Sequence, residues 1–154
     1  MTTFTEHVIL DLPPDEAFAL VSDYRHDPRW RAGVASMQPS TAGPARPGTR
    51  TEETIRFLGR TFVNPGRVVR VDGRCMEWEA SSDTTRARGT RAIAPLGSRR
   101  SSFTYSIEVE LVGAGGFTNA IVGRLFRRRV RKDLRRLRKL VREHAQLPLR
   151  HLAA

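Results

Sequence analysis

A strictly alternating segment and a long amphipathic segment follow one another in the last third of this chain. Within residues 101–112 every second residue from Phe103 to Leu111 is apolar, which predicts a strand with one buried face. A glycine-rich turn at 113–116 ends it, and residues 117–145 then have the apolar spacing of a helix. The helical stripe consists of Phe117, Ile121, Leu125, Val130, Leu134, Leu137 and Val141. Because each apolar surface needs cover, we expect this helix to pack across an antiparallel sheet.

The preceding residues supply one strand, two short helices and a series of further strands. A strand at 4–12 is ended by Pro13 and Pro14, and short helices are expected at 14–22 and 24–30. The alternating pattern starts at residue 34, and strands are expected at 49–58, 61–71 (kinked near 64–66), 74–80, 84–94 and 101–112, with a turn at 95–98. A chain of 154 residues then forms one α+β domain, placed at residues 1–146, and a tail, 147–154.

The positive charge of the chain is concentrated in the expected terminal helix. The net charge is +11, and the segment Arg124–Arg142 holds eleven basic residues and one acid, Asp133. The rest of the chain is nearly neutral, unlike a protein that coats nucleic acid over its whole surface. The helix could be a solvated face without a partner. It could also dock on an anionic membrane or an acidic protein, whereas nucleic acid is a less suitable partner.

Several classes of protein and site are not indicated by the sequence. The single cysteine, Cys75, excludes an internal disulfide framework. No signal peptide and no apolar run long enough to cross a membrane is visible in the sequence, so we expect a cytoplasmic protein. No metal-ligand spacing, phosphate loop, dinucleotide motif or nucleophile elbow is present, so neither a metal nor another cofactor is expected. The four histidines are scattered, and His26 beside Asp27 is interpreted as a surface residue.

Two short stretches resemble a known family. They are Leu12-Pro13-Pro14-Asp15-Glu16-Ala17-Phe18 and Ser22-Asp23 continuing to Asp27-Pro28-Arg29-Trp30, and Gly48 precedes the third strand. With the order of elements, they resemble the START/Bet v 1-like superfamily, and more narrowly the SRPBCC (polyketide cyclase/dehydrase and lipid transport) group, over residues 1 to about 146. The resemblance implies a helix-grip fold, in which a curved antiparallel sheet of about seven strands wraps around a long C-terminal helix. It also implies a cavity for hydrophobic molecules between them, with Trp30 near one mouth.

Candidate ligand-binding residues follow from this arrangement. Aromatic residues on the inward strand faces suit an aromatic or polycyclic ligand, although plain core packing is the alternative for each of them. The candidates are Trp30, Phe57, Trp78, Arg91, Phe103, Tyr105, Phe117 and Ile121. Glu53 and Arg91 share strand faces with apolar residues, so both could point inward and pair with each other or with a ligand, unless the register places them outside.

Three hypotheses on function remain open from the sequence. The first is non-catalytic binding of a lipid-like or aromatic molecule in the cavity. The second is an aromatase/cyclase-like enzyme without a metal, in which Glu53, Arg91 and Tyr105 are weak catalytic candidates and Asn64 and Arg67 are further polar groups. The third is docking of the basic helix on an anionic surface. Ligand identity and oligomeric state are not indicated.

Overall fold

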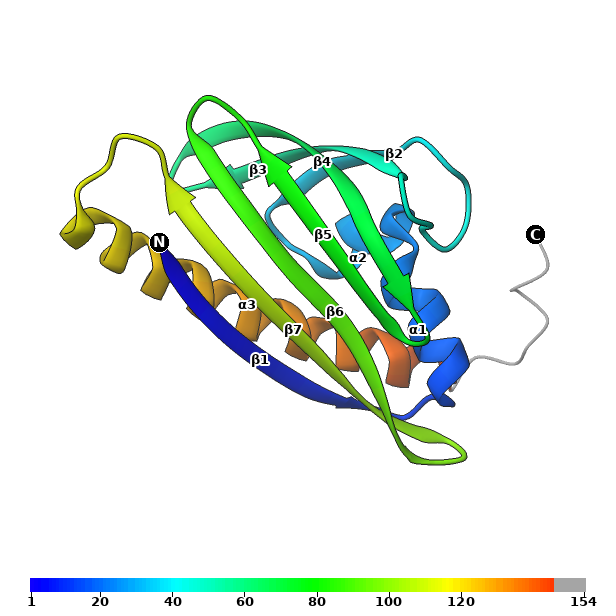
Figure 1. The fold of residues 1–154 in the computed structure, drawn as a ribbon. Coiled ribbons are helices and arrows are strands. Elements are labelled where there is room, and N and C mark those ends of the chain that lie inside the picture. The colour runs from blue at the N-terminus through cyan, green and yellow to red at the C-terminus, as the bar shows by residue number, and fades with distance from the viewer. Residues whose placement is uncertain (146–154) are drawn as a thin grey trace.

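The computed structural model describes residues 1–145; the expected tail, 147–154, lies outside the described residues. One sheet of seven antiparallel strands curls around one face of a long helix (Figure 1). The helices are α1 (Pro14–Ser22), the 3₁₀ turn η1 (Tyr24–His26), α2 (Asp27–Trp30) and α3 (Gly116–Ala145). The strands are β1 (Thr2–Leu10), β2 (Val34–Pro39), β3 (Arg50–Phe57), β4 (Arg60–Asp72), β5 (Cys75–Ser81), β6 (Thr85–Gly97) and β7 (Arg100–Leu111).

The strands lie in the order β1-β7-β6-β5-β4-β3-β2, so the N-terminal strand pairs with the last one. This pairing places β1 at the edge beside α3, which packs against β1 more than against any other strand. The buried side of α3 is formed by Val130, Leu134, Leu137 and Val141. They meet apolar residues of β1 and β7 in the main core, including Leu10. The expected helix-grip fold, with two short helical segments after the first strand, is confirmed.

Two prolines lie inside strands where the sequence predicted interruptions. Pairing of β3 with β4 runs without a break through Pro65, so the expected kink at 64–66 is wrong, and the irregularity falls between Val68 and Arg70 instead. Strand β6 likewise continues through Pro95, where a turn was expected. Both prolines lie just beyond the pairing of their strand with β5, so each has a neighbouring strand on one side only. A proline is tolerated there because its missing N–H breaks no second ladder.

The first turns of α3 are rotated relative to the sequence-based expectation. Phe117, Ile121 and Leu125 were expected to pack on the sheet, but they are 81%, 45% and 39% exposed. Steps of four residues advance about 40° around a helix beyond each full turn, so a stripe built on this spacing drifts away from the core. In their place Gly123 lies against Thr2, where an added Cβ would be 2.3 Å from the Thr2 methyl group.

Candidate ligand-binding cavity and buried charge network

A cavity of about 70 Å³ lies between the inner face of the sheet and the first half of α3. Its wall is mainly apolar and includes small residues on neighbouring strands, Ala80 and Ala87, which face each other across β5 and β6. The other lining residues are Arg31, Glu53, Ile55, Phe57, Phe62, Asn64, Trp78, Thr85, Tyr105, Ile107, Val109, Leu111, Val122 and Phe126. A second hollow of about 30 Å³ shares six of these residues, so the two adjoin.

Apart from Glu53 Oε1, which is held by an ion pair with Arg31, two buried polar atoms in this wall have no hydrogen-bond partner within the described residues. They are Nε1 of Trp78 and Oδ1 of Asn64. Burying a polar group without a partner costs about 1–3 kcal/mol, so native proteins rarely keep such groups without a reason. Because both residues line the apolar cavity, a bound molecule with a polar end could supply the missing partners.

The position of Trp78 depends on a glycine in the next strand. Trp78 of β5 is paired directly with Gly89 of β6. A Cβ added at Gly89 would lie 2.8 Å from the Trp78 ring and 2.2 Å from the Ser106 carbonyl oxygen. The missing side chain therefore lets the indole lie against the backbone, which leaves room in the cavity above it.

A buried ion pair joins α2 to β6 of the sheet. Arg91 of β6 donates from Nη1 to Asp27 Oδ1 at 2.9 Å and from Nη2 to Asp27 Oδ2 at 2.6 Å. Arg91 Nη1 also donates to the Val21 carbonyl oxygen at 2.8 Å. The side chains of Arg91 and Asp27 are 1% and 0% exposed. Burial lowers the pKa of Arg91, but the charge of Asp27 outweighs it and raises the pKa above the ordinary value.

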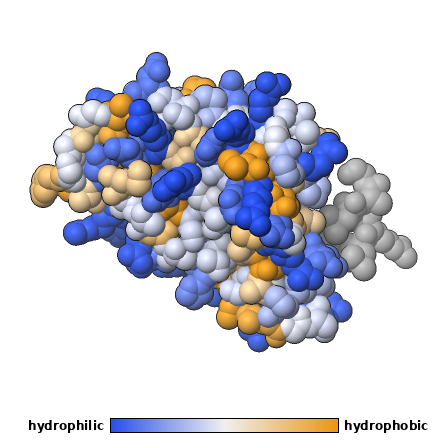
Figure 2. All heavy atoms as spheres, viewed as in Figure 1, coloured by the Kyte–Doolittle hydropathy of each residue, from blue (hydrophilic) through white to orange (hydrophobic). Residues whose placement is uncertain are grey.

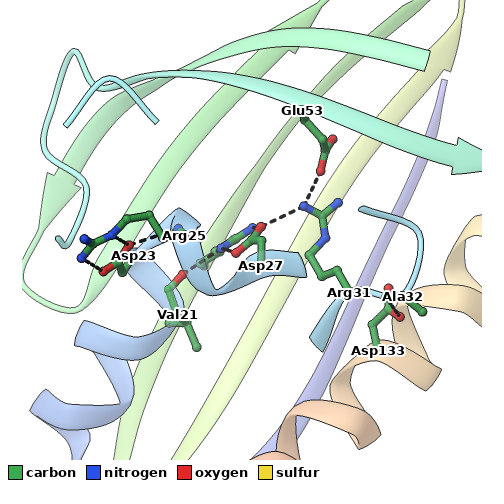
Figure 3. A network of polar contacts seen from close by, with 9 residues as sticks. Val21, Asp23, Arg25, Asp27, Arg31, Ala32, Glu53 and Asp133 are labelled. Carbon is green, nitrogen blue, oxygen red and sulfur yellow. Dashed lines mark hydrogen bonds and ion pairs between the residues drawn. The ribbon is translucent and has the colours of Figure 1, made fainter. Parts of the chain in front are cut away.

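Arg31 connects this pair to the cavity. Its Nη1 donates to Asp27 Oδ2 at 2.9 Å and forms an ion pair with Glu53 Oε1, so Arg31 lies between two carboxylates (Figure 3). Burial lowers the pKa of Arg31, but Glu53 chiefly, with Tyr105 and Asp27, raises it well above its ordinary value. Two arginines and two carboxylates thus form a buried network whose charges balance.

Three aromatic rings surround the Arg91 guanidinium. Its central carbon lies 4.6 Å from the ring centre of Tyr24, 5.2 Å from Tyr105 and 5.5 Å from Trp30. Such contacts stabilise a desolvated cation by about 2 kcal/mol. Both terminal nitrogens are bonded to Asp27 or Val21, which gives Arg91 a structural role, and its Nε, at the second hollow, has no hydrogen-bond partner among the described residues.

The structure separates the sequence-based candidates into three groups. Phe57, Trp78 and Tyr105 line the cavity, together with Glu53. Trp30 and Phe103 are fully buried in the core, with ring centres 6.1 Å apart in an edge-to-face contact. The third group, Phe117 and Ile121, is exposed and does not line the cavity, so their expected place in its wall is wrong.

The polar candidates are also redistributed. Glu53 and Arg91 both point inward, but they do not pair with each other; their partners are Arg31 and Asp27. Asn64 lines the cavity, whereas Arg67 reaches the outer face of the sheet and pairs with Glu79 at 2.6 Å.

Sequence reasoning missed the residues that complete the network and the wall. Asp27 begins α2 and Arg31 caps its end four residues later, a spacing at which opposite charges meet on a helix. That signal was present in the sequence. Val122 and Phe126 were missed because the first half of the apolar stripe of the terminal helix was assigned to the wrong face.

Other features of the described residues do not add a site. A wider, open depression of about 630 Å³ lies on the outer face of the sheet, where Arg67, Glu79, Arg88 and Glu108 lie side by side on four strands. Arg88 pairs with Glu108 as Arg67 pairs with Glu79, so these charges satisfy one another. Within residues 1–145 no three His, Cys, Asp or Glu side chains form a metal-holding group, and no helix has the length and hydropathy to cross a membrane.

With the cavity and its network described, the chain can be compared with known proteins. A family model described as "Polyketide cyclase / dehydrase and lipid transport" matches residues 1–142. The chain belongs to this family. The family resemblance carried by the Pro-Pro-acidic helix start and the Asp27–Trp30 stretch is thereby confirmed. No curated protein sequence matches this member of the family.

Solved structures share the fold of this polyketide cyclase/dehydrase family member at low sequence identity. A START superfamily protein from Mycobacterium smegmatis gives a TM-score of 0.77 at 15% identity, over 92% of this chain and 97% of that one. The Zhui aromatase/cyclase from Streptomyces sp. R1128 gives a TM-score of 0.80 at 10% identity, over 94% of this chain and 96% of that one. A protein from Thermus thermophilus gives a TM-score of 0.78 at 19% identity, over 94% of this chain and 100% of that one. These similarities show the fold, and the family description covers both binding and catalysis.

Proposed function

We propose that this protein binds a small hydrophobic molecule with one polar end, in the cavity between the sheet and α3, without transforming it. The observation that carries the proposal is the pair of unpartnered polar atoms, Trp78 Nε1 and Asn64 Oδ1, in an otherwise apolar wall. A carbonyl or hydroxyl oxygen on the ligand can accept from the indole N–H, and a ligand hydroxyl can donate to the amide oxygen. The apolar remainder then lies against the aromatic and aliphatic side chains, as in most small-molecule sites.

Entry of such a molecule requires side chains to move. Ligand pockets commonly measure about 300–1,000 Å³, which is several times the 70 Å³ of this cavity. Phe57 of β3 and Phe126 of α3 meet edge to face at the cavity wall, with ring centres 5.7 Å apart. Rotation of these two rings would enlarge the cavity, because both belong to its lining and the contact joins the sheet to the helix.

The binding proposal is tested by ligand capture and by filling the cavity. Native mass spectrometry of protein purified from its own host should reveal a co-purified hydrophobic compound. In vitro, the neutral dye Nile red should bind at about one equivalent. Ala87→Phe, which places a ring in the cavity, should weaken dye binding at least about tenfold. Ala94→Phe makes the same replacement on an exposed position of β6 and should leave binding unchanged. Equal binding by both variants and the parent protein contradicts the proposal.

Catalysis on a polycarbonyl chain is the second candidate. It is supported by the Glu53 carboxylate and Tyr105, which both border the cavity. Against it, Glu53 Oε1 is already engaged in an ion pair with Arg31. Product analysis with a linear poly-β-ketone, comparing the parent protein with Glu53→Gln, separates the two functions. A cyclised product that the variant fails to form favours the enzyme.

A further inference from the structure

The outward face of α3 has an apolar end. Phe117, Ile121 and Leu125 form this apolar tip, on successive turns of the helix. The start of α3 extends past the end of the sheet (Figure 1). Figure 2 shows hydrophobic residues at the same protruding end of the molecule. A phenylalanine that is 81% exposed gains nothing from the fold of its own chain, and exposed apolar groups of this kind mark interaction surfaces.

Basic residues continue the same face along the rest of the helix. Arg124, Arg128 and Arg135 follow Phe117 at seven, eleven and eighteen residues, spacings that return to one side of an α-helix. The basic stripe is defined as the α3 cations that pair with no acid and no backbone carbonyl among residues 1–145: Arg124, Arg128, Lys132, Arg135, Arg136 and Arg138. The stripe and the apolar tip together form one amphiphilic surface.

Acids of the protein body compensate only one flank of the helix. Glu6 pairs with Arg127 at 2.5 Å and with Arg131 at 2.9 Å, and Asp11 pairs with Arg142 at 3.3 Å. Asp133, the one acid within the segment, is buried and accepts the Ala32 backbone N–H at 3.1 Å. The outward face therefore keeps its positive charge, although like charges at these spacings destabilise a helix.

A strained turn adds a further exposed apolar residue beside the apolar tip. Leu58, in the two-residue β3–β4 turn, is 61% exposed and has a φ of 51°, a conformation that favours glycine or asparagine. Its neighbour Phe57 contacts Phe126, which is next to Leu125, and Arg129 Nη1 donates to the Arg56 carbonyl oxygen at 2.7 Å. The turn and the first half of α3 are thus held together at one end of the fold.

We propose that this surface docks on an anionic lipid membrane, with the basic stripe facing the phosphate headgroups and the apolar tip entering the boundary of the acyl chains. Each basic residue beside a charged bilayer is attracted to it, and apolar side chains add the free energy of their burial. A nucleic acid would use the stripe but not Phe117, Ile121 and Leu125. A second copy of the chain would bring two positive stripes together and be repelled.

The docking surface and the cavity meet in the same turns of the helix. Val122 and Phe126 line the cavity, while Ile121 and Leu125 beside them face outward. Docking would therefore bring the wall formed by Phe57 and Phe126 close to the lipid. The docking proposal itself does not depend on what the cavity holds.

The experiment is sedimentation of the full chain with two kinds of vesicle, pure phosphatidylcholine and a mixture of phosphatidylcholine with phosphatidylglycerol. Binding should favour the anionic vesicles and weaken as salt rises. Arg128→Glu with Arg135→Glu should lower the partition coefficient at least about tenfold, since each lost cation contributes about 1 kcal/mol. The matched control, Arg46→Glu with Arg99→Glu, changes the net charge equally at exposed positions outside α3 and should change partitioning less than twofold.

Two further arms separate lipid from other anions. Phe117→Ser with Ile121→Ser removes apolar area without changing charge, and it should weaken vesicle binding while leaving Nile red binding unchanged. No preference for anionic vesicles at low salt overturns the proposal. It is also overturned if duplex DNA binds at physiological salt and the serine variant binds it as well as the parent protein does, because the stripe would then serve nucleic acid.

Discussion

Arg91 and Asp27 are joined by two parallel hydrogen bonds of 2.9 and 2.6 Å although both side chains are almost completely buried. The pair connects β6 with α2, and Arg31 extends it to Glu53 on β3. A stretch of chain too short to form a stable helix alone, Asp27–Trp30, is thereby held against the sheet. The buried pair thereby helps to hold Arg31 and Glu53, which line the cavity, in place.

Asp27→Asn should destabilise the fold strongly. Removing one partner of a buried ion pair leaves an uncompensated charge and costs about 3–5 kcal/mol. The measurement is urea unfolding followed by tryptophan fluorescence. Asp72→Asn, which breaks the exposed pair with Arg70, is the matched control and should cost at most about 1 kcal/mol. In a double-mutant cycle, the combined Asp27→Asn and Arg91→Met changes should lower the free energy of unfolding by less than the sum of the two single changes. Equal losses for Asp27→Asn and Asp72→Asn would refute the structural role of the buried pair.

The sequence was sufficient to predict the fold because its patterns are local and strong. Alternation in 101–112 and the apolar spacing of the last helix define the two surfaces that bury each other. Pro65 and Pro95 were misinterpreted because a proline ends a strand only where it breaks a ladder. That depends on which strands lie on either side.

The candidate site was only partly predictable. An inward strand face can be read from alternation, which correctly brought Phe57, Trp78 and Tyr105 to one side of the sheet. Whether an inward residue meets a neighbour or a void depends on the curvature of the sheet and on the rotation of α3. For that reason Trp30 and Phe103 became core residues, and Phe117 became exposed.

Asn64→Leu should stabilise the empty protein and weaken recognition of a polar group. The change removes a buried amide oxygen without a partner, which should add about 1 kcal/mol to the free energy of unfolding. Binding of 1-naphthol should then weaken about tenfold relative to naphthalene. The ratio of the two affinities cancels any steric effect of the leucine, so an unchanged ratio would show that Asn64 does not contact the ligand.

Gly89→Ala should displace Trp78. The added methyl group would clash with the Ser106 carbonyl oxygen and the indole, at 2.2 and 2.8 Å. Overpacking of this kind costs about 1–3 kcal/mol. Tryptophan emission should shift as the ring moves, and the variant should unfold at lower urea. Gly115→Ala, at a position with free space around its Cα, is the control and should leave the emission spectrum unchanged. An unperturbed spectrum for Gly89→Ala would contradict the close packing.

Leu58→Asn should stabilise the β3–β4 turn. Asparagine tolerates positive φ better than leucine, and an asparagine–glycine pair suits a two-residue hairpin. We expect a gain of about 1 kcal/mol in the free energy of unfolding. Val63→Asn replaces another exposed apolar residue within β4 and should have the opposite sign, because asparagine is unfavourable in strands. A loss of stability in Leu58→Asn would mean that the leucine side chain contributes packing that outweighs the strain.

Glu6→Gln should reveal a pH-dependent contribution of the β1–α3 contact. Burial raises the pKa of Glu6, but hydrogen bonds and charges from Arg131 and Arg127 outweigh it and leave the pKa below the ordinary 4.5. A carboxyl whose pKa is lower in the folded state stabilises the fold above the unfolded pKa, and this stability disappears as pH falls through the folded value. The parent protein should therefore be more stable than Glu6→Gln by about 1 kcal/mol at pH 7, and the difference should shrink below pH 4.5.

Melting curves from pH 7 down to the acid limit of folding measure this difference in stability. Glu52→Gln, at an exposed acid without an ion pair in residues 1–145, should show no such trend. A constant difference between the parent protein and Glu6→Gln at every pH would mean that the glutamate acts through packing and not through its charge.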